Sequence, residues 1–491
     1  MPIVNRLLPD LPVASLDAYV EGGGGQALSA ARKLDPAALI DEVAASGLRG
    51  RGGAGFPTGR KWATVRANHS PTAPSTVVVN AAEGEPGCFK DRMLLRYDPY
   101  RVLEGALVGA HAVGADNVIV GIKRTFEPEI ARVRHAIAEI AAAGWLDGVT
   151  VDVVEGPNEY LFGEETGLLE VVDGRYPFPR IAPPFRRGVE EVVETDADVT
   201  DETKSAAHVE MAGPSGETEA PPTLASNVET FANVPGIVVR GAAWFREVGT
   251  DASPGTIVCT VSGATRRHGV GEFALGTPLR EVIESVGGGP RPGRRITAVM
   301  SGVANALVPE SALDTPVSYE ALAGIGSGLG AGGFIVFDDS IDMVAVAQGV
   351  SRFLAVESCG QCTPCKQDGL AISDALERLR EDEATATDMD DMRSRLANVA
   401  YGARCNLATQ HQVVIESIMA LFPEQFSGHL DASLPAAPPY LVAAIHQILR
   451  NHAIVDQREA LKQPDWTFDE TYSGKAPADL LDDHHADLGL L

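Results

Sequence analysis

The sequence is short of positive charge and has no long apolar run. Its 491 residues carry 40 Lys and Arg against 67 Asp and Glu, a formal net charge of −27 at pH 7. This balance argues against binding to nucleic acid, because phosphate backbones are held by clustered basic side chains. No stretch approaches the roughly 20 apolar residues that span a bilayer, so we expect no direct membrane insertion.

The N-terminus also lacks the basic start and apolar core of a secretory signal. We therefore expect a cytoplasmic protein that reaches a membrane, if at all, only through partners. Cysteine is scarce as well, with six residues in the chain. In a cytoplasmic protein a cysteine cluster indicates metal binding more often than disulfides. Two cysteines lie outside the cluster: Cys259, in the apolar run TIVCTV, is expected to be a buried thiol, and Cys88 is given no redox role.

The other four cysteines form the clearest motif. Cys359, Cys362 and Cys365 lie in ESCGQCTPC, and Cys405 follows forty residues after the last of them. A C-x2-C-x2-C run with one distant cysteine is typical of a four-thiolate [4Fe–4S] cluster. The alternatives are unrelated thiols or a structural zinc site, although zinc sites usually consist of two separate CxxC pairs. Arg404, beside the fourth cysteine, is hypothesised to stabilise the negative charge of the cluster and raise its potential.

A glycine-rich loop, GLRGRGGAGF (47–56), offers a second candidate site. Glycine permits a positive φ and close backbone approach, and exposed N–H groups can hold a phosphate. The loop matches neither the G-x-G-x-x-G motif between a strand and a helix nor a P-loop, so an ordinary flexible loop is an equal alternative. Two acidic turns, NAAEGEPG (80–87) and EYLFGEETG (159–167), follow predicted strands at the edge where α/β sheets bind ligands. Their carboxylates suit ribose, ribityl or carboxamide groups; the alternative is ordinary solvated acids.

The order of hydrophobic segments predicts a fold of α/β plus all-α class. Strands at 75–80, 117–122 and 149–154 alternate with helices at 101–113 and 128–144, which predicts a mainly parallel sheet covered by helices. Short strands around one helix then predict a β-grasp, or ubiquitin-like, module. Four amphipathic segments predict a helix bundle with the cysteines at one end. The expected domains are 1–240, 241–339 and 340–430, followed by a surface tail at 431–491. The first contains an acidic insertion at 189–220 that we expect to be solvated, with a docking surface as the alternative.

Six blocks of the chain carry a resemblance to a known family. They are GLRGRGGAGFPTGRKW, NAAEGEPGCFKDR, YLFGEETGLLE, PRIAPPF, SNVETFANVP and ESCGQCTPC. In this order they resemble the NADH-binding flavoprotein (51 kDa) subunit of respiratory complex I, and a similar module occurs in NAD-linked formate dehydrogenases and hydrogenases. The resemblance spans about residues 36–428 outside the insertion. The insertion and tail are additional to the usual family chain, which favours a diverged paralogue.

The resemblance implies FMN, one [4Fe–4S] cluster and NAD(H), on a Rossmann-like flavin domain, a β-grasp domain and a four-helix bundle. The cluster ligands are then Cys359, Cys362, Cys365 and Cys405. The residues implied around FMN are Gly50, Arg51, Gly52, Gly53, Lys61, Asn80, Glu83, Tyr160, Gly163, Glu164, Ser226, Asn227 and Thr230. Those implied around the nicotinamide nucleotide are Phe56, Glu85, Glu165 and Phe185, with the two rings stacked on adenine and the two glutamates orienting the nucleotide as the catalytic pair.

Four positions depart from the family pattern. Ala82 replaces an aspartate that would bond the flavin side chain, at a cost of about 0.5–1.5 kcal/mol for one hydrogen bond. Thr64 replaces an aromatic residue expected on adenine, and Ala182 replaces a lysine on the same side. Ser226 replaces the first residue of an Asn-Asn pair. Because two of these changes fall on the nucleotide side, the preference for NADH is the least secure inference from the sequence.

The implied cofactors define a function. NADH gives up two electrons as a hydride, the cluster accepts one, and FMN bridges the two because it accepts electrons singly or in pairs. The leading hypothesis is an electron-input subunit that oxidises NADH, with partners that include a thioredoxin-like 2Fe–2S subunit and/or other iron–sulfur subunits. The alternatives are an electron-relay or structural subunit with lost or altered NADH activity, and a diaphorase unit that reduces NAD+ for a partner enzyme.

Overall fold

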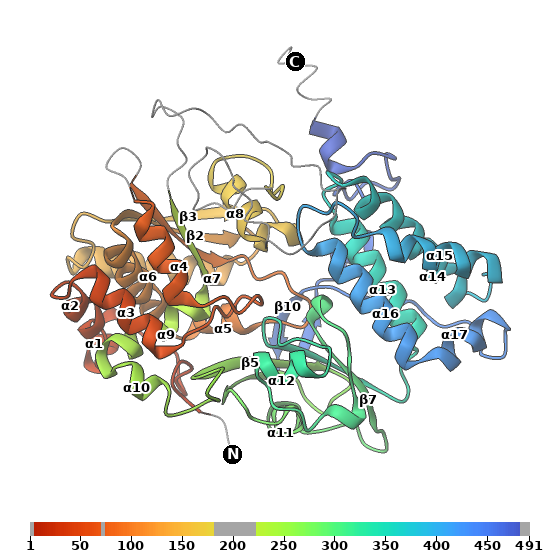
Figure 1. Cartoon of the computed structure of the whole chain (residues 1–491), viewed down its shortest axis with the longest axis horizontal. Helices are drawn as coiled ribbons and strands as arrows, with labels where there is room; N and C mark the ends of the chain where they lie inside the picture. The colour runs from red at the N-terminus through yellow and green to blue at the C-terminus, as the bar shows by residue number, and fades with distance from the viewer. Residues whose placement is uncertain (1–3, 70–73, 181–221, 482–491) are drawn as a thin grey trace, which may run out of the picture.

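A parallel sheet organises the N-terminal half of the computed structural model, which describes residues 4–69, 74–180 and 222–481. Its four strands lie in the order β3–β2–β1–β4 (Figure 1). They are β1 (Ser75–Ala81), β2 (Ala115–Lys123), β3 (Thr150–Gly156) and β4 (Thr223–Asn227). Every adjacent pair is parallel, so the predicted strands and the mixed α/β fold with a parallel sheet are confirmed.

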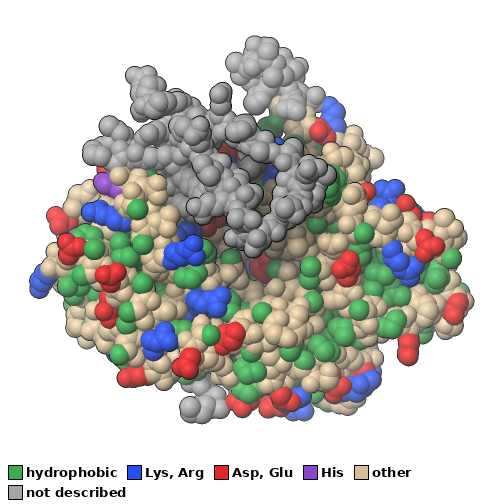
Figure 2. Space-filling model, viewed as in Figure 1, with side chains coloured by type: hydrophobic (Ala, Val, Ile, Leu, Met, Phe, Trp, Pro, Cys, Tyr) green, Lys and Arg blue, Asp and Glu red, His purple; other side chains and the backbone are tan. Residues whose placement is uncertain are grey.

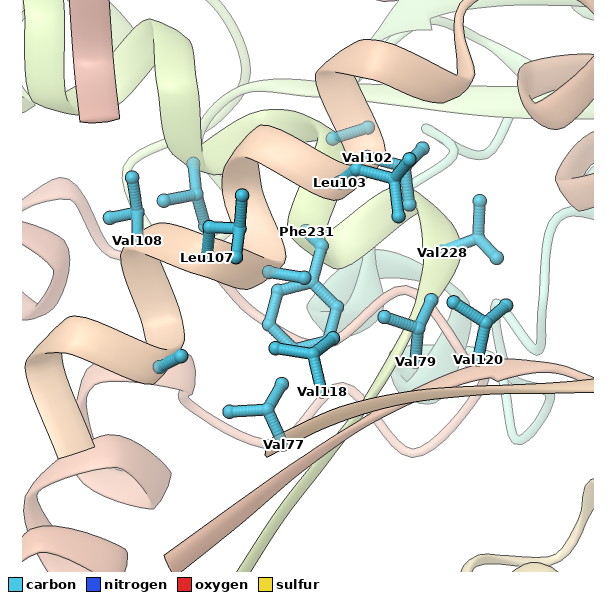
Figure 3. Packing of buried hydrophobic residues seen from close by; sticks show 14 of the residues in the cluster. Val77, Val79, Val102, Leu103, Leu107, Val108, Val118, Val120, Val228 and Phe231 are labelled. Atoms are coloured by element: carbon cyan, nitrogen blue, oxygen red, sulfur yellow. The ribbon is translucent and has the colours of Figure 1, made fainter. Parts of the chain in front are cut away.

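Helices cover both faces of this sheet, which explains the unbroken valine run of β1. Figure 3 shows Val77 and Val79 directed toward α6 and α9, where Phe231 packs beside them. On the other face, Val78 packs with α8. The helices of this part are α1 (Leu16–Glu21), α2 (Gln26–Ala31), α3 (Pro36–Ser46), α4 (Thr58–Ala67), α5 (Lys90–Tyr97), α6 (Pro99–Val113), α7 (Glu127–Ala142), η1 (Tyr160–Gly163), α8 (Glu165–Val172), α9 (Val228–Arg240) and α10 (Ala242–Phe245).

A second, mixed sheet follows in the order β6–β5–β9–β7–β8. Only β5 and β9 pair in parallel, and the other pairs are antiparallel. The strands and the short helices against them enclose a core of their own around Phe273 and Phe334. They are β5 (Thr256–Gly263), β6 (Gly269–Ala274), α11 (Leu279–Val282), η2 (Ile283–Gly287), β7 (Ile296–Ser301), η3 (Gly302–Ala304), β8 (Val308–Pro309), η4 (Glu310–Ala312), α12 (Tyr319–Gly324) and β9 (Gly333–Asp338).

The C-terminal part is mainly helical and centred on α13, which is buried along almost its whole length and packs against α14 and α16. The residues after 430 were expected to form a surface tail. Up to residue 481 they instead contain a hairpin and a 3-10 helix, and Trp466 donates to the carbonyl of Val356 on α13 at 3.0 Å. The elements are α13 (Met343–Glu357), η5 (Pro364–Asp368), α14 (Gly369–Arg380), α15 (Ala386–Asn398), α16 (Leu407–Leu421), α17 (Pro423–Leu430), β10 (Ile445–Leu449), β11 (His452–Val455) and η6 (Gln457–Leu461).

Charged side chains of both signs are mixed over the face shown in Figure 2 and do not gather by sign. Among the described residues, no helix combines the length and apolar character needed to cross a membrane. The acidic insertion at 189–220, with Ala182 and Phe185 just before it, lies outside the described residues.

Candidate active site and cluster site

A cavity of about 650 Å³ lies at the carboxyl ends of β1 and β4, where the sequence predicted a ligand site. Asn80 and Asn227 are paired in register at this edge of the sheet. Among the described residues, every predicted flavin or nucleotide contact lines the cavity except Arg51. The size suits an organic cofactor together with part of a second ligand. Parts of the chain far apart in sequence therefore meet as the motifs predicted.

Arg51 is buried behind the glycine loop instead of lining the cavity. Its guanidinium donates to the carbonyls of Thr256, Arg49 and Pro254, and its backbone N–H donates to Thr230 at 2.9 Å. The side chain thus fastens the loop to β5. A direct contact with a cofactor stays a prediction for this residue.

The glycine loop fits a phosphate group. The Gly50 N–H donates to the Phe56 carbonyl at 2.8 Å and closes the loop on itself. Within the described part of the chain, the N–H groups of Gly52, Gly53 and Ala54 donate to no protein atom. Gly53 has φ +123°, a conformation that L side chains rarely adopt. Successive N–H groups without a protein partner are the type of backbone donor that binds phosphate.

The two glutamates of the first acidic turn differ in their surroundings. Glu83 pairs with Arg92 at 3.0 Å and accepts the Asp91 N–H at 3.0 Å. Burial favours the neutral acid, but these partners outweigh it and hold the pKa of Glu83 below its usual value. For Glu85 burial prevails and raises the pKa, although its oxygens accept from the Tyr160 hydroxyl and the Val303 N–H, both at 2.6 Å.

The second acidic turn is ordered in the same way. Glu164 caps α8, because its carboxylate accepts the Gly167 N–H at 2.8 Å and the Thr166 hydroxyl at 2.6 Å. Glu165 pairs with Lys61 at 2.6 Å inside the cavity.

Phe56 is 46% exposed, so its ring is open to a planar ligand. Thr64 bonds to the Arg60 carbonyl within α4 and does not line the cavity, so this position supplies no substitute for the missing aromatic ring.

Several lining residues were not predicted. Asp91 faces the cavity, and burial, opposed by Lys90, raises its pKa to about 6. Ala82, the position of the missing aspartate, lies nearby with its methyl group in the small apolar cluster under α8. The second sheet contributes Asn305, Gly330 and Ala331, and α16 contributes Gln410. A glycine-rich stretch at 326–333 is the one sequence signal for these additions, since α16 carries no motif.

The four predicted cluster cysteines line one smaller cavity at the end of α13, with Leu161, Pro179 and Leu407 as apolar walls. No three His, Cys, Asp or Glu side chains in the described ranges converge closely enough to hold a single metal ion. Four cysteine side chains around one common space are the ligand set that a [4Fe–4S] cluster requires.

Hydrogen bonds also surround the sulfurs. The Ser358 hydroxyl lies 3.2 Å from the Cys365 sulfur, and the Gln361 amide donates to Cys359 at 3.4 Å. Burial raises the pKa of Cys365 to about 11 and that of Cys405 to about 12, so metal binding must displace their protons. Arg404 lines the cavity but reaches the sulfurs only through Gln361, whose oxygen accepts its guanidinium at 3.1 Å.

Comparison with known proteins agrees with both cavities. Residues 43–236 match the family described as the Nuo51 FMN-binding domain, and residues 345–429 match the NADH-ubiquinone oxidoreductase-F iron-sulfur binding region. The chain is 35% identical over 426 residues to an F-type subunit, number 2, of the NADH-quinone oxidoreductase of Rhizobium meliloti (strain 1021), an alignment that covers 85% of this chain and 94% of the relative. The chain belongs to the family of F-type subunits of NADH-quinone oxidoreductases.

Other relatives in this F-type family have hydrogenase names. The chain is 33% identical to NADP-reducing hydrogenase subunit HndC of Solidesulfovibrio fructosivorans, over 85% of this chain and 81% of the relative. It also matches the solved structure of an NAD+-reducing [NiFe]-hydrogenase in the H2-reduced state, with a TM-score of 0.71 and 30% identity over 85% of this chain and 67% of that one. The predicted FMN, [4Fe–4S] cluster and NADH-dehydrogenase type of oxidoreductase are confirmed by this family membership.

Proposed function

We propose that the chain oxidises NADH in the 650 Å³ cavity, called the main cavity below, with FMN bound there. Single electrons then pass to a [4Fe–4S] cluster in the smaller cavity lined by the four cysteines, called the cluster cavity below, and on to a partner. The observation that carries this proposal is the shared wall: Cys405, Leu161 and Leu407 line both cavities. Bound FMN supplies the step between a two-electron hydride donor and one-electron acceptors. The chain itself must bind, orient and exclude water.

For FMN, the free N–H groups of the glycine loop are the proposed phosphate contacts. Lys61, Asn80, Tyr160 and the turn after β4 complete the flavin side of the cavity in this proposal. The set is Gly50, Gly52, Gly53, Lys61, Asn80, Glu83, Tyr160, Gly163, Glu164, Ser226, Asn227 and Thr230, with Arg51 acting from behind the loop. The absence of an aspartate at Ala82 removes one bond among many, so flavin binding is expected to persist.

For the nucleotide, Glu85 and Glu165 orient polar groups, and Phe56 offers its ring to adenine together with Phe185. Hydride transfer requires no protein acid or base, so these residues act by position. The Lys61–Glu165 pair has a direct consequence for choice of nucleotide. A 2′-phosphate beside Glu165 would meet a carboxylate, whereas Lys61 is already committed to that carboxylate at 2.6 Å. We therefore favour NADH over NADPH.

The architecture is proposed to follow the same division. Residues 1–240 form the flavin and nucleotide domain, residues 241–339 a β-grasp domain, and residues 340–430 a four-helix bundle that holds the cluster. The mixed sheet with its short helices supports the second assignment, and the packing of α14 and α16 against α13 supports the third. Residues 431–491 form an additional C-terminal segment.

The partner is proposed to be another redox subunit of a complex, such as a thioredoxin-like 2Fe–2S subunit or other iron–sulfur subunits. The names of the relatives favour this, since two of them are subunits of a quinone oxidoreductase and of a hydrogenase. The likeness to an NAD+-reducing hydrogenase also favours a second candidate, in which the same site reduces NAD+ with electrons from the partner.

The test is turnover by the purified chain after reconstitution with FMN, iron and sulfide. NADH should reduce ferricyanide at a rate well above that with NADPH, and Glu85→Gln should slow it by about tenfold, the loss of one charge-assisted contact. Glu416→Gln, at an exposed site on α16, is the matched control. No turnover with either nucleotide, while FMN and cluster are both bound, would contradict the proposal. Reduced viologen with NAD+ tests the reverse direction.

A further inference from the structure

A second polar cavity of about 240 Å³ adjoins the main one. The N-terminal α/β part, helix α13 and the C-terminal segment all contribute to its lining. Gly84 and Tyr160 line both cavities, so one thin wall separates them. That wall carries the turn from which Glu85 faces the main cavity.

A chain of short contacts crosses this wall. The Lys462 ammonium lies 2.6 Å from the Glu357 carboxylate, and both side chains are at most 3% exposed. The second oxygen of Glu357 accepts the backbone N–H of Tyr160 at 2.8 Å. The Tyr160 hydroxyl then donates to Glu85 at 2.6 Å. A cation from the C-terminal segment is thus linked through three contacts to the nucleotide site.

Lys462 is itself held firmly against α13. The Arg352 guanidinium donates to the carbonyls of Glu459, Ala460 and Lys462 at 2.9–3.1 Å. Trp466, four residues later, donates to the Val356 carbonyl. The whole segment lies after residue 429, where the match to the iron-sulfur region ends, so no family motif includes it.

Other cations near Glu357 are engaged elsewhere. Lys366, on η5, donates to three carbonyls at the end of α13, and Lys123, on β2, donates to the Asn158 carbonyl. Glu459, from the same segment as Lys462, also lines the cavity, and burial raises its pKa to about 7. In the described ranges, Lys462 is therefore the one cation that hydrogen-bonds to Glu357. A buried carboxylate that loses its partner reorganises or takes up a proton.

We propose that Lys462 is a positioning residue for nucleotide oxidation: through Glu357 it fixes the backbone of Tyr160, and thereby the hydroxyl that holds Glu85. The inference rests on the proposed function, because it assumes that Glu85 orients the nucleotide. It assigns a role at the active site to the C-terminal segment. Tyr160 is the titratable group that bonds to Glu85, so a displaced hydroxyl leaves its carboxylate short of a donor.

The test compares Lys462→Met with Lys462→Arg, which restores the cation. We expect Lys462→Met to lower kcat/KM for NADH about fivefold at pH 7, mainly through KM, with unchanged FMN and iron content. The acid limb of the kcat/KM profile should move to higher pH, because a carboxylate with fewer donors binds its proton more tightly. Lys462→Arg should recover most of the rate. Arg450→Met, at an exposed position of the same segment that lines neither cavity, should change nothing.

A double variant separates positioning from a structural role. Tyr160→Phe removes the hydroxyl, so adding Lys462→Met to it should cause little further loss if both act through the same bond. If Lys462→Met lowers Tm but leaves KM and the pH profile unchanged, the proposal is wrong. If that variant does not fold, Lys462→Gln takes its place, and a wild-type pH profile in Lys462→Gln rejects the proposal equally. An inactive wild-type chain would instead reject the proposed function.

Discussion

The two cavities on either side of Cys405 are built in different ways. The main cavity draws its lining from the glycine loop, both acidic turns, the second sheet and α16, and each of its charged side chains is hydrogen-bonded or ion-paired to another protein group. The cluster cavity is lined chiefly by residues 358–365 and 403–407, which include the four cysteines. A cluster held by covalent ligands needs few residues at fixed spacing, whereas a large organic cofactor needs a shape. The cluster cavity therefore tolerates few substitutions, whereas the main cavity spreads its binding energy over many contacts.

Removal of one sulfur should have the largest effect. Cys405→Ser is expected to abolish the iron content and the EPR signal of the reduced cluster while FMN binding is retained, because the flavin side keeps all its other contacts. Iron analysis and flavin fluorescence measure the two separately. Cys259→Ala removes a buried thiol far from the motif and should keep its iron. A full cluster in Cys405→Ser would mean that another residue provides the fourth ligand.

A single methyl group in the glycine loop should have the next largest effect. Gly53→Ala places a side chain at φ +123° and adds a Cβ 3.8 Å from the Gly330 backbone. Backbone strain of about 1–3 kcal/mol in the binding conformation corresponds to a loss of about 5- to 150-fold in FMN affinity. Gly174→Ala imposes similar strain at φ +80° in a turn with open space around it. Equal FMN affinity in Gly53→Ala and the wild-type chain would remove the loop from the flavin site.

The contrast between the cavities also explains what the sequence could reveal. The cysteine spacing predicted four residues that line one cavity together, because ligand spacing is a local property of the sequence. The sheet was predicted for a similar reason, since the buried valines of β1 form a continuous run. Asn305 and Gln410 were not predicted, because they reach the cavity only through the packing of separate parts. The hydrogen bonds of the Arg51 guanidinium to three carbonyls behind the loop were also not predicted, and its contact with FMN stays a prediction. Lys462 lies in a segment that carries no motif at all.

The C-terminal segment also contacts the cysteine loop, and we expect these contacts to stabilise a bound cluster less than the cysteines themselves do. The Ala478 N–H donates to the Cys359 carbonyl at 3.0 Å, and Ala476 packs against Gly360, where a Cβ would lie 2.2 Å from its own. A chain ending at residue 475 loses both contacts and keeps Lys462. We expect the cluster to be lost in air about two- to tenfold faster, as for one hydrogen bond, with KM for NADH unchanged. The decay of cluster absorbance measures this, and an altered KM would contradict the separation of the two roles.

The helical part should also show its own pH dependence. Both nitrogens of buried His429 bond to carboxylates, Asp342 at 2.8 Å and Asp382 at 2.9 Å. Burial alone would lower the pKa of His429, but the two carboxylates outweigh it and raise the pKa above 6.5. The stabilisation is therefore complete below about pH 6.5 and is lost as the pH rises through the folded-state pKa. Relative to His429→Gln, the wild-type chain should lose about 1–2 kcal/mol between pH 6 and pH 9 in urea unfolding. A constant difference would show that the imidazole is neutral throughout.

The smallest effect should come from the charge beside the cluster. Arg404 is exposed and meets the sulfurs only through the Gln361 amide, so its influence is screened by solvent. Such a surface interaction is worth less than about 1 kcal/mol. Since about 1.4 kcal/mol corresponds to 59 mV for one electron, Arg404→Glu should lower the midpoint potential of the cluster by roughly 20–40 mV. Arg295→Glu, an equally charged change in the second sheet, is the control for net charge. An equal shift in both variants would mean that the potential responds to total charge alone. A shift only in Arg404→Glu would mean that the charge of Arg404 affects the cluster through its hydrogen bond to Gln361.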